Sequence, residues 1–380
     1  MTLPIKVVSI IDSVKLKDGG PSHSLADIAK SNLYNNINHD IVHLGSRENY
    51  KYSDKIKYIN LNDGYFKYGV SIKLIFWLIK NRKKYKKFFF HGLWQFQTLI
   101  ARIILKNDYY VFTHGMLDPY FGKENIKTLK KKIYWYFFER ENLKKSKAVL
   151  VNSQTEVNHL KKTFVNTKGI NIKRVNYGII KPKINTNKKI LKNKYPFLKK
   201  NKYILYIGRI NPKKGLDLLI KSFAKIKSKK NYILIISGPI ENQNFKKKLD
   251  KSIEANNLKN KIFFTGFVEG NNKWNFIKFS EFTVLPSYGE NFGVSVVESL
   301  SMGKPVILSN KVGLSKTVKK YSCGIIHNLN IKSLSSSIEN AISFSKNKKM
   351  KLSKASIKCF NQNYNLKLNK SFSNWIRNDK

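Results

Sequence analysis

The most constraining feature of this sequence is a regular alternation between short apolar segments and longer stretches with helical periodicity. The short segments are rich in β-branched and aromatic residues, which favour strands. Such alternation is typical of βαβ units, in which helices join parallel strands. Strands are predicted at residues 5–11, 40–44, 88–91, 109–113 and 148–151, and in a second series at residues 203–207, 232–237, 262–264, 282–285 and 306–308.

Two series of strands fit a chain of 380 residues, which is long enough for two domains. Residues 181–202 are rich in Lys and Asn, contain two prolines and lack periodicity, so they are predicted to be a linker. We therefore expect an α/β protein of two Rossmann-like doubly wound domains facing a cleft. The domains are expected at residues 1–180 and 203–361, with residues 362–380 returning to the first domain as a helix.

The chain is strongly basic, with 73 Lys and Arg against 23 Asp and Glu and a formal charge of +50. Such an excess favours anionic partners. Two explanations stay open: codons of an AT-rich genome raise the content of Lys, Asn and Ile, or the surface faces an anionic bilayer, where each Lys contributes about 1 kcal/mol. The basic residues are spread over every segment, and no nucleic-acid motif is present, so a nucleic-acid partner is not expected.

Several classes of protein are disfavoured by composition. Cys323 and Cys359 are the only cysteines and have no metal-ligand spacing, which argues against a disulfide framework and a zinc site. No apolar run approaches the roughly 18 residues of a membrane span. Residues 1–12 are predicted to be a strand rather than a signal peptide. We expect a cytoplasmic protein, soluble or peripheral on the inner face of the membrane.

In doubly wound sheets, ligands bind beyond the carboxyl ends of the strands, so the loops that follow strands are the candidate sites. Gly19 and Gly20 precede a helical pattern and would let backbone N–H groups approach a phosphate, although a plain turn has the same pattern. His114 follows a predicted strand and precedes a glycine, which places it where a substrate hydroxyl or phosphate could bind. His91 repeats the pattern one strand earlier and is a weaker candidate.

The segment 208–215 follows the first strand of the second series. Arg209 can engage phosphate oxygens with its planar guanidinium, and Lys214 can add a mobile positive charge. Together they would neutralise a diphosphate. Lys214 is one of many lysines and could be incidental, whereas arginine is scarce in this chain.

The segment 286–298 follows the strand predicted at residues 282–285. Its glycines and a helix that begins near Val294 would present backbone N–H groups to a phosphate or sugar, with Glu290 in the loop. Glu298 lies about two helical turns beyond Glu290 among apolar residues, so its carboxylate should be partly buried and need a partner, such as ribose hydroxyls. The alternative is a surface glutamate on an ordinary helix.

These motifs together resemble the large group of retaining glycosyltransferases of the GT-B fold that is often called family four. The resemblance spans nearly the whole chain. It rests on Gly19-Gly20, Thr113-His114-Gly115, Val151-Asn152-Ser153, Tyr177-Gly178-Ile179, Gly208-Arg209, Lys213-Lys214-Gly215, Gly238-Pro239, Gly266-Phe267-Val268, Gly303-Lys304-Pro305-Val306 and, most specifically, Glu290 and Glu298 with seven residues between them.

The resemblance implies that the second domain binds a nucleotide-diphosphate sugar. Arg209 and Lys214 would bind the diphosphate, and Glu298 the ribose. The implied catalytic residues are His114, Glu290, Arg209 and Lys214, and the implied sugar-donor site comprises Gly19, Gly20, Arg209, Lys214, Gly238, Phe267, Val268, Glu290, Asn291, Phe292, Gly293, Val294 and Glu298.

The implied reaction moves the sugar, with retention, to a saccharide or lipid-linked saccharide acceptor in surface polysaccharide biosynthesis. Cleavage places negative charge on the diphosphate, which the two cations and helix N–H groups can stabilise. No Asp-x-Asp metal-ligand pair is present, so we expect no metal and no cofactor. The alternatives are a nucleotide-sugar 2-epimerase or a phosphorylase on the same fold and, more remotely, a basic nucleic-acid-binding protein.

Overall fold

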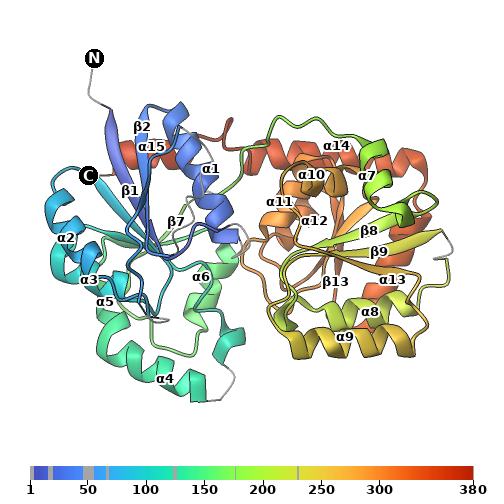
Figure 1. The fold of residues 1–380 in the computed structure, drawn as a ribbon, viewed down its shortest axis with the longest axis horizontal. Helices are drawn as coiled ribbons and strands as arrows, with labels where there is room; N and C mark the ends of the chain where they lie inside the picture. Colours follow the sequence, from blue (N-terminus) through green and yellow to red (C-terminus); the bar gives the residue numbers. More distant parts are fainter. Residues whose placement is uncertain are drawn as a thin grey trace. The chain divides into compact units, whose positions relative to one another are not determined.

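A computed structural model describes residues 4–15, 20–45, 55–65, 68–122, 126–175, 177–228 and 231–379. The chain divides into two compact units. The first comprises Met1–Ile180 and Leu366–Lys380, and the second comprises Lys181–Asn365. Figure 1 shows each unit as a twisted sheet flanked by helices on both faces.

The first unit is built on a seven-stranded sheet with the order β3-β2-β1-β4-β5-β6-β7, and every pair in it is parallel. The order runs outward in both directions from β1, as in a doubly wound fold. Its strands are β1 (Ile5–Ile11), β2 (Ile37–His43), β3 (Tyr58–Asn60), β4 (Lys87–His91), β5 (Tyr110–Phe112), β6 (Ala148–Val151) and β7 (Ile172–Arg174). Its helices are α1 (Gly20–Tyr34), α2 (Ile72–Asn81), α3 (Phe96–Leu105), η2 (Pro119–Gly122), α4 (Ile126–Tyr134), the π-helical turn η3 (Trp135–Glu139), α5 (Arg140–Lys145), α6 (Gln154–Lys161) and α15 (Ser371–Asn378).

Both faces of the central strands are buried, which explains why β5 and β6 are continuous apolar runs. Successive residues of a strand point to opposite faces. Phe88 and Phe90 of β4 therefore join the core cluster that includes residues of α2 and α3. Phe89 between them contacts Phe372 and Trp375 of α15, with ring centroids 5.8 and 6.2 Å away.

The second unit repeats the same arrangement with six parallel strands in the order β10-β9-β8-β11-β12-β13. Its strands are β8 (Lys202–Ile207), β9 (Tyr232–Ser237), β10 (Ile262–Gly266), β11 (Phe282–Leu285), β12 (Val306–Ser309) and β13 (Gly324–His327). Its helices are α7 (Lys188–Lys194), η4 (Pro196–Leu198), η5 (Pro212–Lys214), α8 (Leu216–Ala224), α9 (Gln243–Ala255), α10 (Gly270–Phe279), α11 (Val294–Ser301), α12 (Ser315–Lys320), α13 (Ile331–Ser343) and α14 (Lys346–Asn363). In Figure 1, α8, α9 and α13 cover one face, and α10, α11 and α14 cover the other.

The predicted fold class is confirmed, with two Rossmann-like sheets and a C-terminal helix that packs on the first of them. The segment 181–202 differs from the predicted linker. It contains α7 and η4 and groups with the second unit, because Leu191 and Leu198 are buried there. The return to the first unit begins at Leu366, whose N–H donates to the Ile179 carbonyl oxygen at 3.2 Å, rather than at residue 362.

Candidate functional site

The carboxyl ends of β8 and β9 approach each other so closely that only glycine fits between them. Gly238 follows β9 with φ of 150°, and a Cβ atom built on it would lie 1.9 Å from the Gly208 carbonyl oxygen. Beneath this contact, the buried Tyr206 donates a hydrogen bond of 2.9 Å from its hydroxyl to the Arg209 carbonyl oxygen. The backbone that carries Arg209 is therefore held at the strand edge.

A second close approach joins the segment 208–215 to the loop after β11. Gly215 has φ of 70°, and a Cβ atom on it would lie 2.2 Å from the Pro286 carbonyl oxygen. The Tyr288 N–H donates to the Lys213 carbonyl oxygen at 2.9 Å. The Tyr288 hydroxyl donates to Asp217 of α8 at 3.1 Å. The two candidate segments therefore form one surface, although they lie about 75 residues apart in the chain.

Lys214 and Glu290 meet on this surface as an ion pair and hydrogen bond. Both side chains are largely buried. Burial alone would raise the pKa of Glu290, but the charge and hydrogen bond of Lys214, with smaller effects from Lys213 and Arg209, bring this pKa below its ordinary value. Glu290 is therefore a carboxylate surrounded by cations at neutral pH.

Arg209 is also paired, with a residue that the sequence did not single out. Its guanidinium donates to Glu241 at 2.5 Å, and the Asn211 side-chain amide donates to the other oxygen of Glu241 at 2.6 Å. Arg209 is partly exposed and so is Glu241. Both predicted phosphate-binding cations thus have a carboxylate partner within the unit.

The loop that carries Glu290 is fixed by its backbone. The Glu290 N–H donates to the Lys311 carbonyl oxygen at 3.2 Å, and the Gly313 N–H donates to the Glu290 carbonyl oxygen at 2.7 Å. A Cβ atom on Gly313 would lie 1.9 Å from the Asn291 carbonyl oxygen, so Gly313 packs directly under the loop. Phe292 is buried against Tyr364, with ring centroids 5.7 Å apart.

The helix α11 begins just after this loop. Gly293 precedes it in the left-handed conformation, with φ of 78°, and Val294 is its first residue. The first turn of a helix carries unpaired N–H groups and the positive end of the helix dipole. Glu290 and Lys214 therefore lie beside a helix end that favours anions.

Glu298 is buried, as its apolar neighbours predicted, with 5% of its surface exposed. Lys273 of α10 donates to its Oε1 atom at 2.6 Å. Between β10 and α10 lie Phe267, which is 40% exposed, and Val268, which is buried. Nothing in the sequence pointed to Lys273, because it is one lysine among many and lies 25 residues from its partner.

In the first unit, His114 lies at the carboxyl end of β5 in a left-handed conformation with φ of 46°. The buried Glu156 holds this strand end: its Oε1 atom accepts hydrogen bonds from the Thr113 hydroxyl at 2.6 Å and from the Gly115 N–H at 2.7 Å. The His114 Nε2 atom lies 2.9 Å from the His91 Nδ1 atom, so the two candidate histidines are in contact.

Of the glycine pair near the N-terminus, Gly20 is the first residue of α1, and Gly19 lies outside the described residues. Gly20 and His114 belong to the first unit, whereas Arg209, Lys214, Gly238, Glu290 and Glu298 belong to the second. The structure brings Arg209, Lys214, Gly238 and Glu290 together at the strand ends of one sheet, whereas Glu298 lies within α11 and pairs with Lys273 of α10.

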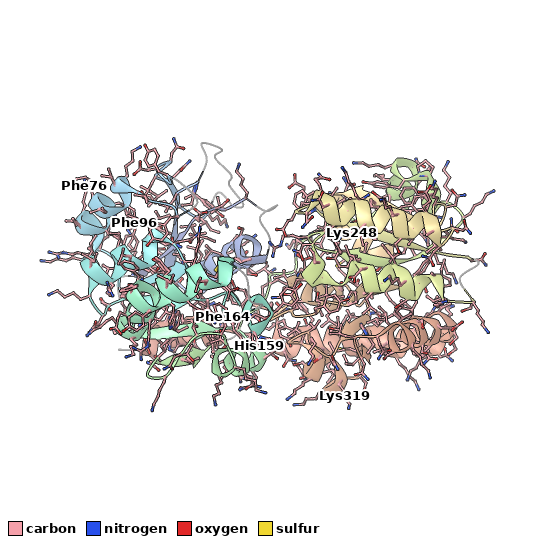
Figure 2. The ribbon with its side chains drawn as sticks, turned by 90° about the horizontal axis from the view of Figure 1, so that it is seen from below. Phe76, Phe96, His159, Phe164, Lys248 and Lys319 are labelled. Carbon is pink, nitrogen blue, oxygen red and sulfur yellow. The ribbon has the colours of Figure 1, made fainter. Side chains whose placement is uncertain are left out.

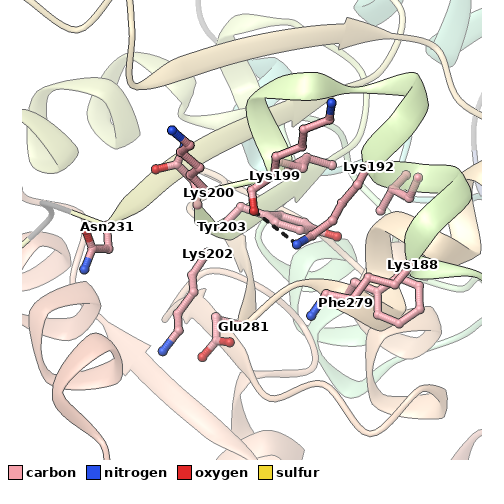
Figure 3. A pocket seen from close by; sticks show the side chains of 12 residues that line it. Lys188, Lys192, Lys199, Lys200, Lys202, Tyr203, Asn231, Phe279 and Glu281 are labelled. Atoms are coloured by element: carbon pink, nitrogen blue, oxygen red, sulfur yellow. Dashed lines mark hydrogen bonds between the residues drawn. The ribbon is translucent and has the colours of Figure 1, made fainter.

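A cavity of about 330 Å³ lies elsewhere in the second unit (Figure 3). It is found where β8 and β9 begin, at Lys202 and Asn231, and is therefore at the opposite end of the sheet from Arg209. Lysines dominate its lining, with Glu281 as the acidic residue. Its position does not match the strand-end rule for ligands in this fold.

The described residues contain no group of three or more His, Cys, Asp and Glu side chains arranged to hold a metal ion. No helix among them is long and apolar enough to cross a bilayer.

Part of the chain is similar to a known protein family. Residues 187–358 match the family described as glycosyl transferases group 1. An uncharacterised glycosyltransferase of Methanocaldococcus jannaschii is 32% identical over 124 residues, which cover 33% of this chain and 31% of that protein. The match thus spans about a third of the relative's length.

Solved structures show the same fold over the whole chain. HepE of Anabaena, solved in complex with UDP and glucose, has a TM-score of 0.76 at 17% identity, with 98% of this chain and 99% of that one covered. WaaG, described as a glycosyltransferase involved in lipopolysaccharide biosynthesis, has a TM-score of 0.74 at 13% identity and covers 98% of this chain and all of its own.

Proposed function

We propose that this chain is a retaining glycosyltransferase that uses a nucleotide-diphosphate sugar, because residues 187–358 match the family described as glycosyl transferases group 1. The observation that carries this proposal is the grouping of Arg209, Lys214 and Glu290 at the strand ends beside α11. Two cations and a helix N-terminus suit a diphosphate, and a carboxylate among them suits sugar hydroxyls.

The ion pairs within the site suggest how the sugar donor enters. A diphosphate would compete with Glu290 for Lys214 and with Glu241 for Arg209, because each cation now has one carboxylate partner. Glu290, released from Lys214, could then accept hydrogen bonds from the sugar. The ion pairs keep both cations ordered before the donor binds, and the exchange supplies positive charge where the leaving diphosphate develops negative charge.

The same cations support a reaction without a divalent metal. Arg209, Lys214 and the N–H groups at the start of α11 would do what a metal ion does for a leaving diphosphate. We propose that Glu298 binds the ribose while Lys273 stays paired to its other side, and that the backbone at Phe267 and Val268 contacts the base. The structures of HepE with UDP and with UDP-glucose support the proposal that the donor of this protein carries uridine rather than guanosine.

The test of this site is a thermal-shift measurement with UDP, GDP and their sugars. A ligand at 100 times its dissociation constant stabilises the protein by about 2.7 kcal/mol. We expect a UDP-sugar to raise the melting temperature and Glu298→Ala to remove the shift. Glu281→Ala is the matched control, because Glu281 also pairs with a lysine, Lys349 at 2.7 Å, but lies at the other end of the sheet.

An equal shift in Glu298→Ala and in the native protein would contradict the assignment of the ribose site. Loss of the shift in Glu281→Ala as well would attribute the effect to general destabilisation.

We further propose that the acceptor is a saccharide or lipid-linked saccharide of a surface polysaccharide, which is supported by the likeness to WaaG, a protein of lipopolysaccharide biosynthesis.

An apolar and basic surface on the first unit supports the proposal that the protein binds an anionic membrane on its cytoplasmic side. The helical segment α4–η3 exposes several large apolar side chains, among which Tyr136 is 75% exposed. These side chains are Leu129, Ile133, Tyr136, Phe137 and Phe138, and the exposed lysines beside them are Lys130 and Lys132. Aromatic and basic residues on one helical surface are typical of proteins that bind the bilayer interface.

Binding to vesicles tests the membrane proposal. We expect the protein to sediment with vesicles that contain anionic lipid and to remain in solution with zwitterionic ones. Tyr136→Ser with Phe137→Ser should release it from the anionic vesicles, whereas Met350→Ser with Ile357→Ser, which alters exposed apolar residues of α14, should not. Figure 2 shows lysine side chains, such as Lys248 and Lys319, that point outward elsewhere on the surface. Unchanged binding of the first variant would attribute association to this general charge and overturn the proposed surface.

A further inference from the structure

A chain of buried hydrogen bonds runs from His114 into the first unit. The His114 Nε2 atom lies 2.9 Å from the His91 Nδ1 atom. The His91 Nε2 atom lies 3.0 Å from the Ser9 Oγ atom, and Ser9 Oγ lies 2.8 Å from the His39 Nε2 atom. His91, Ser9 and His39 come from the three adjacent strands β4, β1 and β2 and are all buried.

The chain continues beyond the sheet to two helices. The Asn32 Nδ2 atom of α1 lies 2.9 Å from the His39 Nδ1 atom. The Ser373 hydroxyl of α15 donates to the Asn32 Oδ1 atom at 2.8 Å. Asn32 and Ser373 are buried, so neither end of this contact exchanges with water. Six residues therefore form one connected series, five of them from five different elements and His114 from the loop after β5.

The three imidazoles of the chain are neutral at pH 7. Burial lowers the pKa of His39 to about 3 and that of His114 to about 4. Burial, reinforced by the neighbouring His114 and His39, also lowers the pKa of His91 well below its ordinary value. A neutral imidazole has one ring nitrogen that donates and one that accepts. His39, His91 and His114 must therefore each adopt one of two tautomers.

The side-chain amide of Asn32 determines which atom donates in each hydrogen bond between Asn32 and His114. An Nδ2 atom can only donate, so the His39 Nδ1 atom accepts and its Nε2–H donates to Ser9. The Ser9 hydroxyl is then free to donate only to the His91 Nε2 atom. The His91 Nδ1–H consequently donates to the His114 Nε2 atom. The proton of His114 is thereby confined to its Nδ1 atom.

We propose that Ser373, Asn32, His39, Ser9 and His91 are positioning residues that hold His114 as the Nδ1–H tautomer. His114 then offers a hydrogen-bond donor, and not an acceptor, to an oxygen atom of the bound ligand. The ring is only partly buried, and its neighbours Thr113 and Gly115 are fixed by Glu156, so it can meet a ligand without moving. That the oxygen belongs to the nucleotide sugar rests on the proposed function.

The tautomer can be measured without any ligand. Long-range ¹H–¹⁵N correlation spectra of the full chain, labelled in its 7 histidines, distinguish Nδ1–H from Nε2–H imidazoles. His114→Gln and His39→Gln assign the two decisive signals. We expect Nδ1–H for His114 and Nε2–H for His39. The opposite pair of tautomers would overturn the proposal, and so would a charged imidazole at either position at pH 7.

Two variants test whether the chain transmits the choice. Asn32→Asp replaces the amide donor by a group that only accepts, so every bond from residue 32 to His114 should reverse and His114 should become the Nε2–H tautomer, while the Ser373 hydroxyl still donates to residue 32. Ser9→Ala cuts the chain and should leave His114 with mixed tautomers. Ser146→Ala removes another buried hydroxyl of the first unit, which donates to the Leu143 carbonyl oxygen. This variant should leave the tautomers of His39 and His114 unchanged.

Activity separates this inference from the proposed function. If the protein is a glycosyltransferase, Ser9→Ala should lower kcat/KM by about tenfold, which corresponds to the loss of one hydrogen bond to the ligand. If His114 is the Nδ1–H tautomer but the protein has no transferase activity, the role of the hydrogen-bonded series is supported and the proposed function is refuted. An unchanged Nδ1–H signal in a folded Ser9→Ala protein would refute that role, whatever the activity.

Discussion

At the scale of single residues, the candidate site depends on glycines that let strand ends touch. Gly238 has two constraints, a positive φ and the Gly208 carbonyl oxygen 1.9 Å from where its Cβ atom would be. Gly266 has the first constraint alone, because its φ is 72° and a Cβ atom would meet nothing within 4 Å. Substituting each glycine by alanine therefore distinguishes the cost of the backbone conformation from the cost of the steric contact.

We predict that Gly238→Ala lowers the free energy of unfolding by about 3 kcal/mol, since strain and overpacking add. Gly266→Ala should cost about 1 kcal/mol, the cost of the left-handed conformation. Urea denaturation of each purified variant measures both values. Equal costs would show that the contact between Gly208 and Gly238 relaxes freely.

Sequence patterns identified the residue types of the site but not their partners. The apolar neighbours of Glu298 predicted its burial, which the structure confirms. The partners Lys273 and Glu241 could not be predicted, because each is fixed by the packing of a different helix or loop against the strand ends. In the same way, His91 was visible as a pattern, but its bond to His114 depends on the register between β4 and β5.

At the scale of elements, the last helix is held to the first unit by a buried ion pair. Lys87 of β4 is 2% exposed, and its Nζ atom lies 2.9 Å from the Asp379 Oδ2 atom. Lys173 binds the other carboxylate oxygen at 2.8 Å, and the Tyr110 hydroxyl donates to the same group. Burial would raise the pKa of Asp379, but Lys173, Tyr110 and Lys87 lower it well below its ordinary value.

We predict that Asp379→Asn lowers the free energy of unfolding by about 3 kcal/mol at pH 7, because the buried Lys87 loses its counter-charge. A carboxylate whose pKa is lowered by folding stabilises the protein above its unfolded pKa of about 4, and this contribution is lost as the pH falls towards the folded value. The difference between the native protein and the variant should therefore shrink below pH 4.

The control for this prediction is Asp108→Asn. Asp108 pairs with Lys147 at 3.1 Å, but both side chains are exposed, so its replacement should change stability by less than about 1 kcal/mol. Denaturant unfolding at pH 7 and at pH 3 measures both variants. A loss in Asp379→Asn no larger than that in Asp108→Asn would contradict the structural importance of the buried pair.

The sequence predicted the central strands of both sheets well and missed three edge strands. The strands β1, β6, β9 and β11 have the predicted bounds, because buried parallel strands are continuous apolar runs. The strands β3, β7 and β13 lie at sheet edges, where a few residues pair on one side only. Their short, mixed sequences carry no periodic signal, so only pairing with a neighbour defines them.

At the scale of the whole molecule, two doubly wound units of one topology divide the candidate residues between them. The sequence predicted this fold because each unit repeats the βαβ pattern. It could not identify the acceptor, since the loops that differ among proteins of one fold carry no general code. The chemistry proposed for the second unit is metal-independent transfer of a sugar.

Transfer from a radiolabelled UDP-sugar to lipid-linked saccharides, assayed in EDTA with product analysis, tests this chemistry. We predict that label moves to the saccharide with retained anomeric configuration, and that Lys214→Ala lowers kcat by about a hundredfold or more, because one stabilising cation is lost. Activity that EDTA abolishes and manganese restores would contradict the proposed mechanism. Label recovered only as an epimerised nucleotide sugar or as a sugar 1-phosphate would contradict the proposed function.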